Sequence, residues 1–124
     1  MISVLVIDDE RDIREAVTEV LVYEGYEVLD ARDGAEGLEQ LRAHHPSVVL
    51  LDLMMPGMNG WEFCAARKLD PELSAIPVII ISALGSVSGV EAEAFLQKPF
   101  DLEALLAAVR HCARADGEGA GARA

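Results

Sequence analysis

Three short, unbroken apolar runs constrain the fold of this chain more than any other feature of its sequence. They occupy residues 2–7 (ISVLVI), 48–53 (VVLLDL) and 78–82 (VIIIS), and they are rich in valine and isoleucine. A strand with one face in water alternates apolar and polar residues, whereas a strand covered on both faces is apolar throughout. The runs therefore predict buried strands of a parallel sheet with helices on both faces, which is an α/β architecture.

The rest of the chain alternates between expected helices and expected strands. Capping residues and apolar periodicity predict helices over residues 11–24, from Asp33 onwards, from Asn59 to about residue 70, and after Asp101. Two further short strands are expected at residues 26–30 and 94–97. We expect one domain over residues 1–115, followed by a flexible Gly/Ala-rich tail at residues 116–124.

Composition narrows the class of protein. The chain has 124 residues, 52% of them apolar, which suffices for one domain with a substantial core. No apolar run reaches the length of a membrane span, and no secretory signal is visible, so we expect a soluble cytoplasmic protein. The net charge of −12 argues against nucleic acid or an anionic membrane as a binding partner.

Charged residues stand where the expected strands end. Asp8 and Asp9 follow the first apolar run, Asp52 lies near the end of the second, and Lys98 follows residues 94–97. The carboxyl ends of parallel strands meet at one edge of the sheet, so these side chains should converge there. Three adjacent carboxylates must take up protons or hold a cation, and at neutral pH the suitable cation is Mg²⁺, which prefers oxygen ligands.

Four motifs at these strand ends resemble the receiver domain of bacterial response regulators. They read VIDDE at residues 6–10, LDLMMPGMNG at 51–60, ISA at 81–83 and FLQKPF at 95–100. The resemblance extends from Val4 to Val109 and implies a doubly wound, flavodoxin-like sheet of five parallel strands in the order 2-1-3-4-5. In that order the helices that carry Cys64 and Cys112 cover opposite faces of the sheet, so we expect no disulfide between them.

The resemblance also implies the roles of the acidic residues. Asp52 would accept a phosphoryl group from a phosphohistidine of a histidine kinase or a histidine phosphotransfer protein. Asp9, Asp52 and the backbone carbonyl of Met54 would bind Mg²⁺ directly, and Asp8 would act mostly through a metal-bound water. The chain would thus be a signalling phosphoacceptor that assists its own phosphorylation, and not a conventional enzyme.

Further residues are implied to bind the phosphoryl group and to respond to it. Lys98, aimed by a cis peptide bond before Pro99, and the hydroxyl of Ser82 would each interact with phosphoryl oxygens. Ser82 and Phe95 would form the switch that alters contacts with a downstream effector protein. Because Met54 and Leu84 offer no base for attacking water, we expect slow self-dephosphorylation.

One segment departs from the family pattern. Residues 83–97 are too few for a full helix before the last strand, and residues 84–90 include two glycines and two serines, which are poor helix formers. We therefore predict a shortened or disordered fourth helix. Since the usual output surface would be remodelled, we expect a monomer or a weak dimer.

Two other functions remain open at this point. A phosphohydrolase of another doubly wound family would also use an aspartate and Mg²⁺, but its nucleophile follows the first strand in a D-x-D pattern, whereas residues 8–10 read DDE. A pseudo-receiver would keep the fold as a binding scaffold without phosphorylation. Because the chain starts with Met1 and ends in the expected tail, we favour a complete stand-alone receiver without an output domain over the alternative, a fragment of a longer regulator.

Overall fold

A computed structural model describes residues 2–84 and 89–123 of the chain, which form one parallel sheet and the helices that cover it. The strands are β1 (Ser3–Ile7), β2 (Glu27–Ala31), β3 (Val48–Asp52), β4 (Val78–Ser82) and β5 (Ala94–Gln97). The helices in the described residues are α1 (Arg11–Tyr23), α2 (Gly34–His44), α3 (Gly60–Lys68) and α4 (Leu102–Arg123). The order in the sheet is β2-β1-β3-β4-β5, which confirms the predicted topology.

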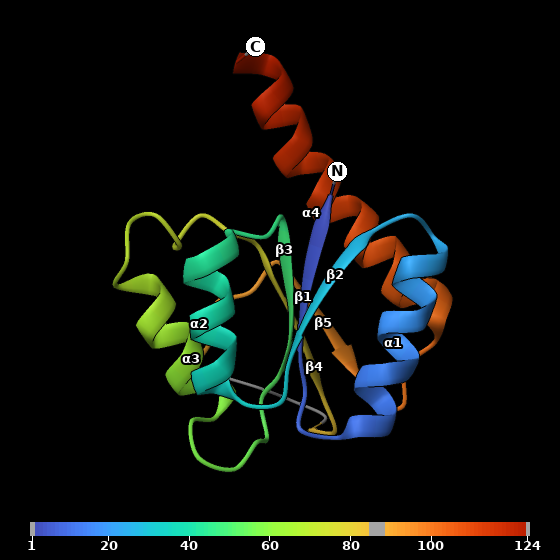
Figure 1. Cartoon of the computed structure of the whole chain (residues 1–124), viewed down its shortest axis with the longest axis vertical. Coiled ribbons are helices and arrows are strands. Elements are labelled where there is room, and N and C mark those ends of the chain that lie inside the picture. The colour runs from blue at the N-terminus through green and yellow to red at the C-terminus, as the bar shows by residue number, and fades with distance from the viewer. Residues whose placement is uncertain (1, 85–88, 124) are drawn as a thin grey trace.

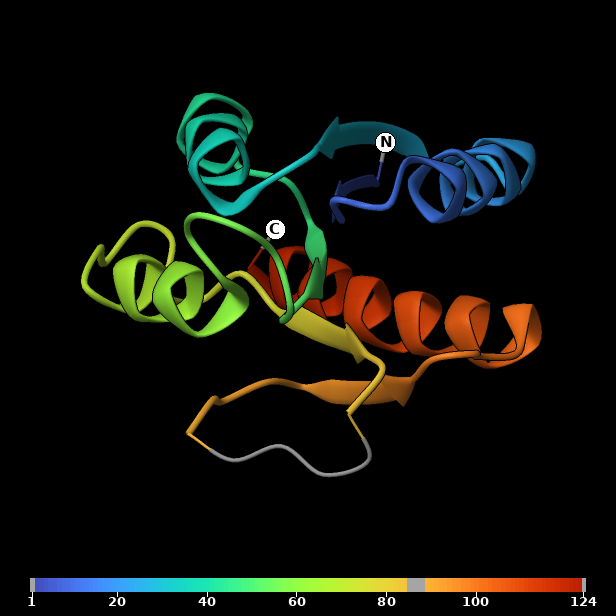
Figure 2. The same cartoon turned by 90° about the horizontal axis from the view of Figure 1, so that it is seen from below.

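The helices cover the two faces of the sheet in pairs. Helices α2 and α3 lie on one face, and α1 and α4 lie on the other, so the sheet is the middle layer (Figures 1 and 2). Strands β3 and β4 are buried over their whole length, because each of their faces contacts a helical layer. The apolar runs are therefore explained by burial on both sides, as the sequence predicts.

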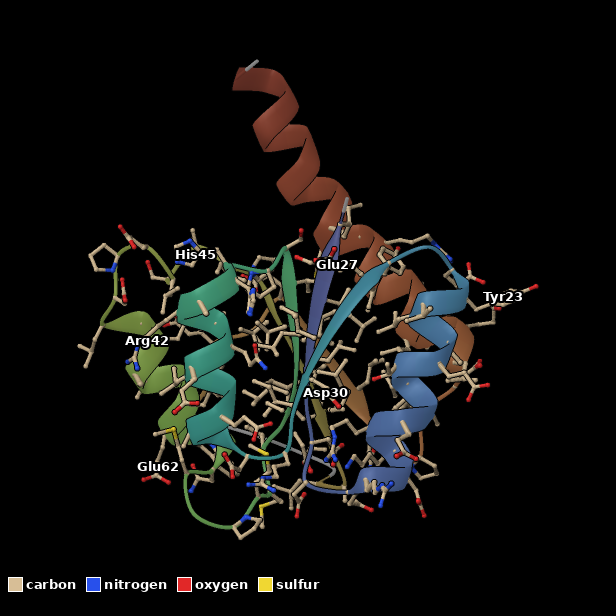
Figure 3. The ribbon with its side chains drawn as sticks, viewed as in Figure 1. Tyr23, Glu27, Asp30, Arg42, His45 and Glu62 are labelled. Atoms are coloured by element: carbon tan, nitrogen blue, oxygen red, sulfur yellow. The ribbon has the colours of Figure 1, made fainter. Side chains whose placement is uncertain are left out.

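The core has two halves that the sheet separates. Leu5, Ile7, Leu41, Leu51 and Phe63 belong to the half under α2 and α3, together with Cys64. The other half, under α1 and α4, includes Cys112. Both cysteines are buried and free, which confirms that they do not form a disulfide. By contrast, Tyr23 at the end of α1 points away from the core into solvent (Figure 3).

Local signals place the ends of several helices. Gly25, just after α1, has a φ of +94°, a conformation that glycine adopts without steric cost. The side chain of Asn59 accepts a hydrogen bond from the amide of Glu62, and the Glu62 carboxylate accepts one from the amide of Asn59. This capping box starts α3 directly after the loop that follows Asp52, so it determines where that loop ends.

The connection between β4 and β5 contains no helix in its described part, residues 83–84 and 89–93. This agrees with the prediction that the helix expected between these two strands is shortened or disordered. Residues 85–88, which belong to the same prediction, lie outside the described residues.

At the carboxyl end of the chain, the backbone of α4 is helical through Arg123 and extends beyond the sheet (Figure 1). This helix includes most of residues 116–124, for which flexibility stays a prediction.

Candidate functional site

The register of the strands brings the predicted site residues to one edge of the sheet. Ile7 pairs with Leu51, so Asp8 comes next to Asp52 at the ends of β1 and β3. Ser82 is the last residue of β4, and Lys98 directly follows β5. The backbone amide of Lys98 donates a 2.7 Å hydrogen bond to the carbonyl of Ser82, which continues the pairing of these strands. The carboxyl edge of the sheet therefore gathers the charged groups into one crevice.

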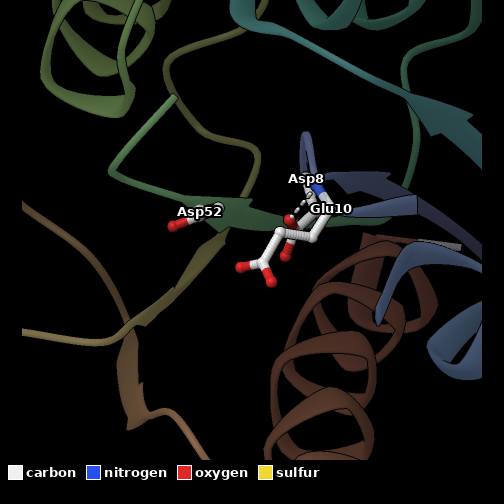
Figure 4. A group of neighbouring side chains, drawn as sticks. All are labelled: Asp8, Glu10 and Asp52. Carbon is white, nitrogen blue, oxygen red and sulfur yellow. Dashed lines mark hydrogen bonds between the residues drawn. The ribbon is translucent and has the colours of Figure 1, made fainter. Parts of the chain in front are cut away.

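Asp8 is the most deeply buried acid of this crevice, with no exposed surface. Its Oδ1 accepts a 2.8 Å hydrogen bond from the backbone amide of Glu10 (Figure 4). Its Oδ2 lies 3.0 Å from Nζ of Lys98 but accepts no well-oriented hydrogen bond within the described part of the chain. A buried carboxylate oxygen without a hydrogen bond is costly, so this atom is suited to binding a cation.

The backbone at Asp8 is held by a second positive group. Nη1 of Arg14 donates a 2.7 Å hydrogen bond to the carbonyl of Asp8. Nε of Arg14 lies 3.3 Å from Oδ2 of Asp30, which is near the carboxyl end of β2 (Figure 3). Because Arg14 belongs to α1, this guanidinium connects α1 with the ends of β1 and β2. It thereby helps to orient the turn from which Asp8 projects.

Asp52 is buried at the end of β3 and has two kinds of partner. Its Oδ1 accepts a 3.2 Å hydrogen bond from the amide of Met54, and its Oδ2 accepts one of 3.3 Å from Lys98. The pKa of Asp52 is raised from an ordinary 3.8 to about 6. Burial is the largest cause and the negative charge of Asp8 adds to it, whereas Lys98 and the Met54 amide partly offset both.

Lys98 is surrounded by carboxylates. Its Nζ lies 3.0 Å from Asp8 Oδ2, 3.0 Å from Glu10 Oε1 and 3.3 Å from Asp52 Oδ2. Burial acts to lower the pKa of Lys98, but the carboxylates of Asp8 and Glu10 outweigh burial and hold that pKa above its usual value. The peptide bond between Lys98 and Pro99 is cis, as the resemblance implies. The amine therefore stays charged and neutralises part of the negative charge in the crevice.

Ser82 and Phe95 lie beside the crevice on the two outer strands of that side. Ser82 is completely buried, and its hydroxyl oxygen accepts a 3.1 Å hydrogen bond from the amide of Leu84. Phe95 pairs in register with Ile80 and is 40% exposed, so its ring is largely outside the core. The residues expected to form the switch thus start from a buried hydroxyl and an outward aromatic side chain.

The crevice has the donors that a hard divalent cation requires. Carboxylate oxygens of Asp8, Glu10 and Asp52 lie within 4.8 Å of one another (Figure 4). Together with the buried Asp8 Oδ2 that lacks a hydrogen bond, this all-oxygen set fits Mg²⁺. Asp9, which the resemblance implies as a direct ligand, is exposed and is not in this group. The backbone carbonyl of Met54 stays a predicted ligand, because the contact seen at this residue is the hydrogen bond from its amide to Asp52.

Sequence reasoning did not assign a role to Glu10, although the structure brings this residue into the crevice. Glu10 is the third of three consecutive acids and occupies the N-cap of α1. Acidic residues near helix starts are common, so the residue type alone gives no reason to select it. The available signal is its position, because the N-cap of a helix that follows a strand lies at the same edge as the strand end.

One groove borders the site, and a second groove shares no residue with it. One has a volume of about 510 Å³ and includes apolar residues of α1 and of the start of α4, with Glu10 and Lys98 also in its wall. The other, of about 410 Å³, lies between α3 and residues 89–91. At this second groove Nζ of Lys68 forms a 2.6 Å ion pair with Glu91.

No helix within residues 2–84 and 89–123 combines the length and the apolar character needed to cross a bilayer.

Comparison with known proteins identifies the family. Residues 4–110 match the model of the response regulator receiver domain. The chain is 40% identical over 115 residues to the response regulator MprA of Mycobacterium ulcerans, an alignment that covers 88% of this chain and 49% of MprA. The chain therefore belongs to the response regulator receiver family of two-component systems. It spans about half the length of the curated relatives it matches.

Solved structures agree with this assignment. The chemotaxis response regulator CheY4 of Vibrio cholerae superposes with a TM-score of 0.84 at 32% identity, over 90% of this chain and 98% of that protein. The response regulator StyR superposes with a TM-score of 0.86 at 31% identity, over 98% of this chain and 63% of StyR. The fold is therefore that of a receiver domain.

Proposed function

We propose that this receiver accepts a phosphoryl group on Asp52 from a phosphohistidine of a histidine kinase or a histidine phosphotransfer protein. The observation that carries the proposal is the buried carboxylate of Asp52 at the end of β3, beside both Asp8 and the ammonium group of Lys98. This arrangement combines a nucleophile with fixed positive charge. Such positioning and charge stabilisation supply most of the catalysis of phosphoryl transfer.

In the proposed transfer, a carboxylate oxygen of Asp52 forms a bond to phosphorus while the P–N bond to the donor imidazole breaks. The imidazole leaves and takes up a proton. Lys98 donates to a phosphoryl oxygen, and the hydroxyl of Ser82, released from Leu84, donates to another. The N–H of Met54 keeps the Asp52 carboxylate oriented for in-line attack.

Mg²⁺ would be held by carboxylates of the crevice, with Asp8, Asp9, Asp52 and the carbonyl of Met54 as the expected ligands and Glu10 as a further neighbour. When bound, the cation would neutralise charge on the phosphoryl oxygens. Asp8 would give its Oδ2, which lacks a hydrogen bond, to this cation or to a water bound to it. Lys98 would then be free of Asp8 and could turn towards the phosphoryl group.

The groove between α1 and the start of α4 is the proposed docking place of the phosphodonor protein. Its wall includes Glu10 and Lys98, so a partner seated there would bring its histidine close to Lys98, which contacts Asp52. The apolar side chains of Ile13, Phe100 and Leu102 would supply contact area. Phosphorylation would then move Ser82 and Phe95 and change the affinity for a downstream effector, with the receiver acting as a cytoplasmic monomer or weak dimer.

The phosphoryl group should be lost slowly by self-catalysis. Met54 is exposed at the mouth and Leu84 follows the Ser82 turn, and neither side chain can act as a base for water. The chain would therefore act as a phosphoacceptor and not as an efficient phosphatase.

The test uses beryllofluoride, which mimics a phosphoryl group, together with phosphoramidate, whose P–N bond resembles that of phosphohistidine. Amide NMR shifts should show saturable, Mg²⁺-dependent binding of beryllofluoride, and mass spectrometry should find phosphoramidate-derived phosphate on Asp52. Asp52→Asn should abolish both, whereas Asp33→Asn, at the N-cap of α2, should abolish neither. If the wild type binds no beryllofluoride and gains no phosphate, the proposal is wrong and a phosphorylation-independent binding scaffold is favoured.

A further inference from the structure

We infer that Glu10 is a positioning residue that restrains Lys98 in the unphosphorylated state and thereby slows phosphorylation. The inference rests on the proposed function of Asp52. It starts from the hydrogen bonds of Lys98, which donates to Glu10 Oε1 at 3.0 Å and to Asp52 Oδ2 at 3.3 Å. The lysine that is needed at a phosphoryl group on Asp52 is thus held at least as closely by Glu10 as by Asp52.

The carboxylate of Glu10 has no other partner in the described structure. Glu10 is the N-cap of α1, but its side chain makes no capping hydrogen bond. At this turn the side chain that accepts a hydrogen bond from a backbone amide is that of Asp8, and the donor is the amide of Glu10. Capping therefore does not account for the position of the Glu10 carboxylate, whereas its ion pair with Lys98 does.

Exposure separates Glu10 from the two other carboxylates around the lysine. The side chain of Glu10 is 58% exposed, compared with 0% for Asp8 and 4% for Asp52. Releasing Lys98 from Glu10 returns that carboxylate to water at little cost, whereas releasing it from Asp8 or Asp52 leaves a buried charge. Once Mg²⁺ compensates the charge of Asp8, as proposed above, Glu10 is the remaining exposed competitor for Lys98 and gives way when a phosphoryl group arrives.

The charge of Glu10 opposes the incoming group as well. A phosphoryl group brings nearly two negative charges, and the Glu10 carboxylate lies within 4.8 Å of the Asp52 carboxylate. Both effects have the same sign, because the carboxylate repels the phosphoryl group and competes with it for Lys98. Removing the charge of Glu10 should therefore speed phosphorylation once Mg²⁺ is saturating.

The experiment compares Glu10→Gln with the wild type and with Asp12→Asn. Asp12 is an exposed acid in the first turn of α1, so Asp12→Asn makes the same change in net charge without touching Lys98. The first readout needs no cation: reductive methylation of Lys98 in EDTA, followed by peptide mass spectrometry. The second readout is the rate of phosphorylation by phosphoramidate at saturating Mg²⁺.

We expect Lys98 of Glu10→Gln to be methylated faster than Lys98 of the wild type and of Asp12→Asn. We also expect Glu10→Gln to be phosphorylated about two- to fivefold faster than both, which is the range that a half-exposed ion pair supports. Rates equal to those of Asp12→Asn, or slower phosphorylation of Glu10→Gln, would overturn the inference. A wild type that gains no phosphate on Asp52 would instead disprove the proposed function, and the methylation comparison would still decide whether Glu10 restrains Lys98.

Discussion

Replacing Asp52 with asparagine should stabilise the cation-free protein above neutral pH. The unfolded chain titrates Asp52 near its ordinary 3.8, whereas burial and the neighbouring Asp8 raise the pKa in the folded protein to about 6. Between these two values the folded protein holds more protons than the unfolded chain. The free energy of unfolding therefore falls as the pH rises through this window, and the loss is complete above it.

The size of the effect follows from the difference between the two pKa values. A shift from 3.8 to about 6 corresponds to about 3 kcal/mol, which is an upper limit for the gain from removing the charge. Lys98 keeps its ion pairs with Asp8 and Glu10 in the variant, so its own charge stays compensated. The wild type should also recover stability when Mg²⁺ binds the folded state, and the variant should recover less.

Urea unfolding in EDTA, followed by circular dichroism at about pH 4 and about pH 8, measures this difference. Asp52→Asn should be more stable than the wild type at the higher pH and nearly equal to it at the lower pH. Asp9→Asn is the matched control, because Asp9 is exposed and the same chemical change should have little effect there. A variant that is no more stable than the wild type at the higher pH would refute the reasoning.

Three further predictions follow from the structure. Arg14→Met should lower the free energy of unfolding by about 1–3 kcal/mol, because it leaves the carbonyl of Asp8 without its donor. Arg11→Met is the control: its ion pair is exposed, so the free energy of unfolding, measured with urea for both variants, should change by less than about 1 kcal/mol. Phe95→Ala should still accept phosphate but should bind a partner equally with and without beryllofluoride; a wild type that does not distinguish the two states would contradict this. Amide hydrogen exchange of residues 89–92 should be much faster than that of β4, because backbone pairing with β4 begins only at Glu93. Equal protection of residues 89–92 and of β4 would contradict this prediction.

Much of the fold could be predicted from the sequence because its signals are local. The uninterrupted valine and isoleucine runs indicated strands buried on both faces, and Asn59 with Glu62 indicated the start of α3. The gathering of Asp8, Asp52 and Lys98 also followed, because parallel strands end at one edge. The strand order came from the resemblance to a family, since the residues themselves do not specify which strands are neighbours.

The direction of each side chain at the edge of the sheet was decided by the tertiary structure alone. Asp8 and Asp9 are adjacent and chemically identical, yet Asp8 is buried against Lys98 and Asp9 is exposed, while Glu10 turns back to the lysine. These orientations depend on how the chain turns from β1 into α1, where Arg14 holds the carbonyl of Asp8. The amino-acid sequence thus determined which charged residues stand at this edge of the sheet. Which of them contact one another depends on the packing of α1 against the sheet, a long-range property that no short motif encodes.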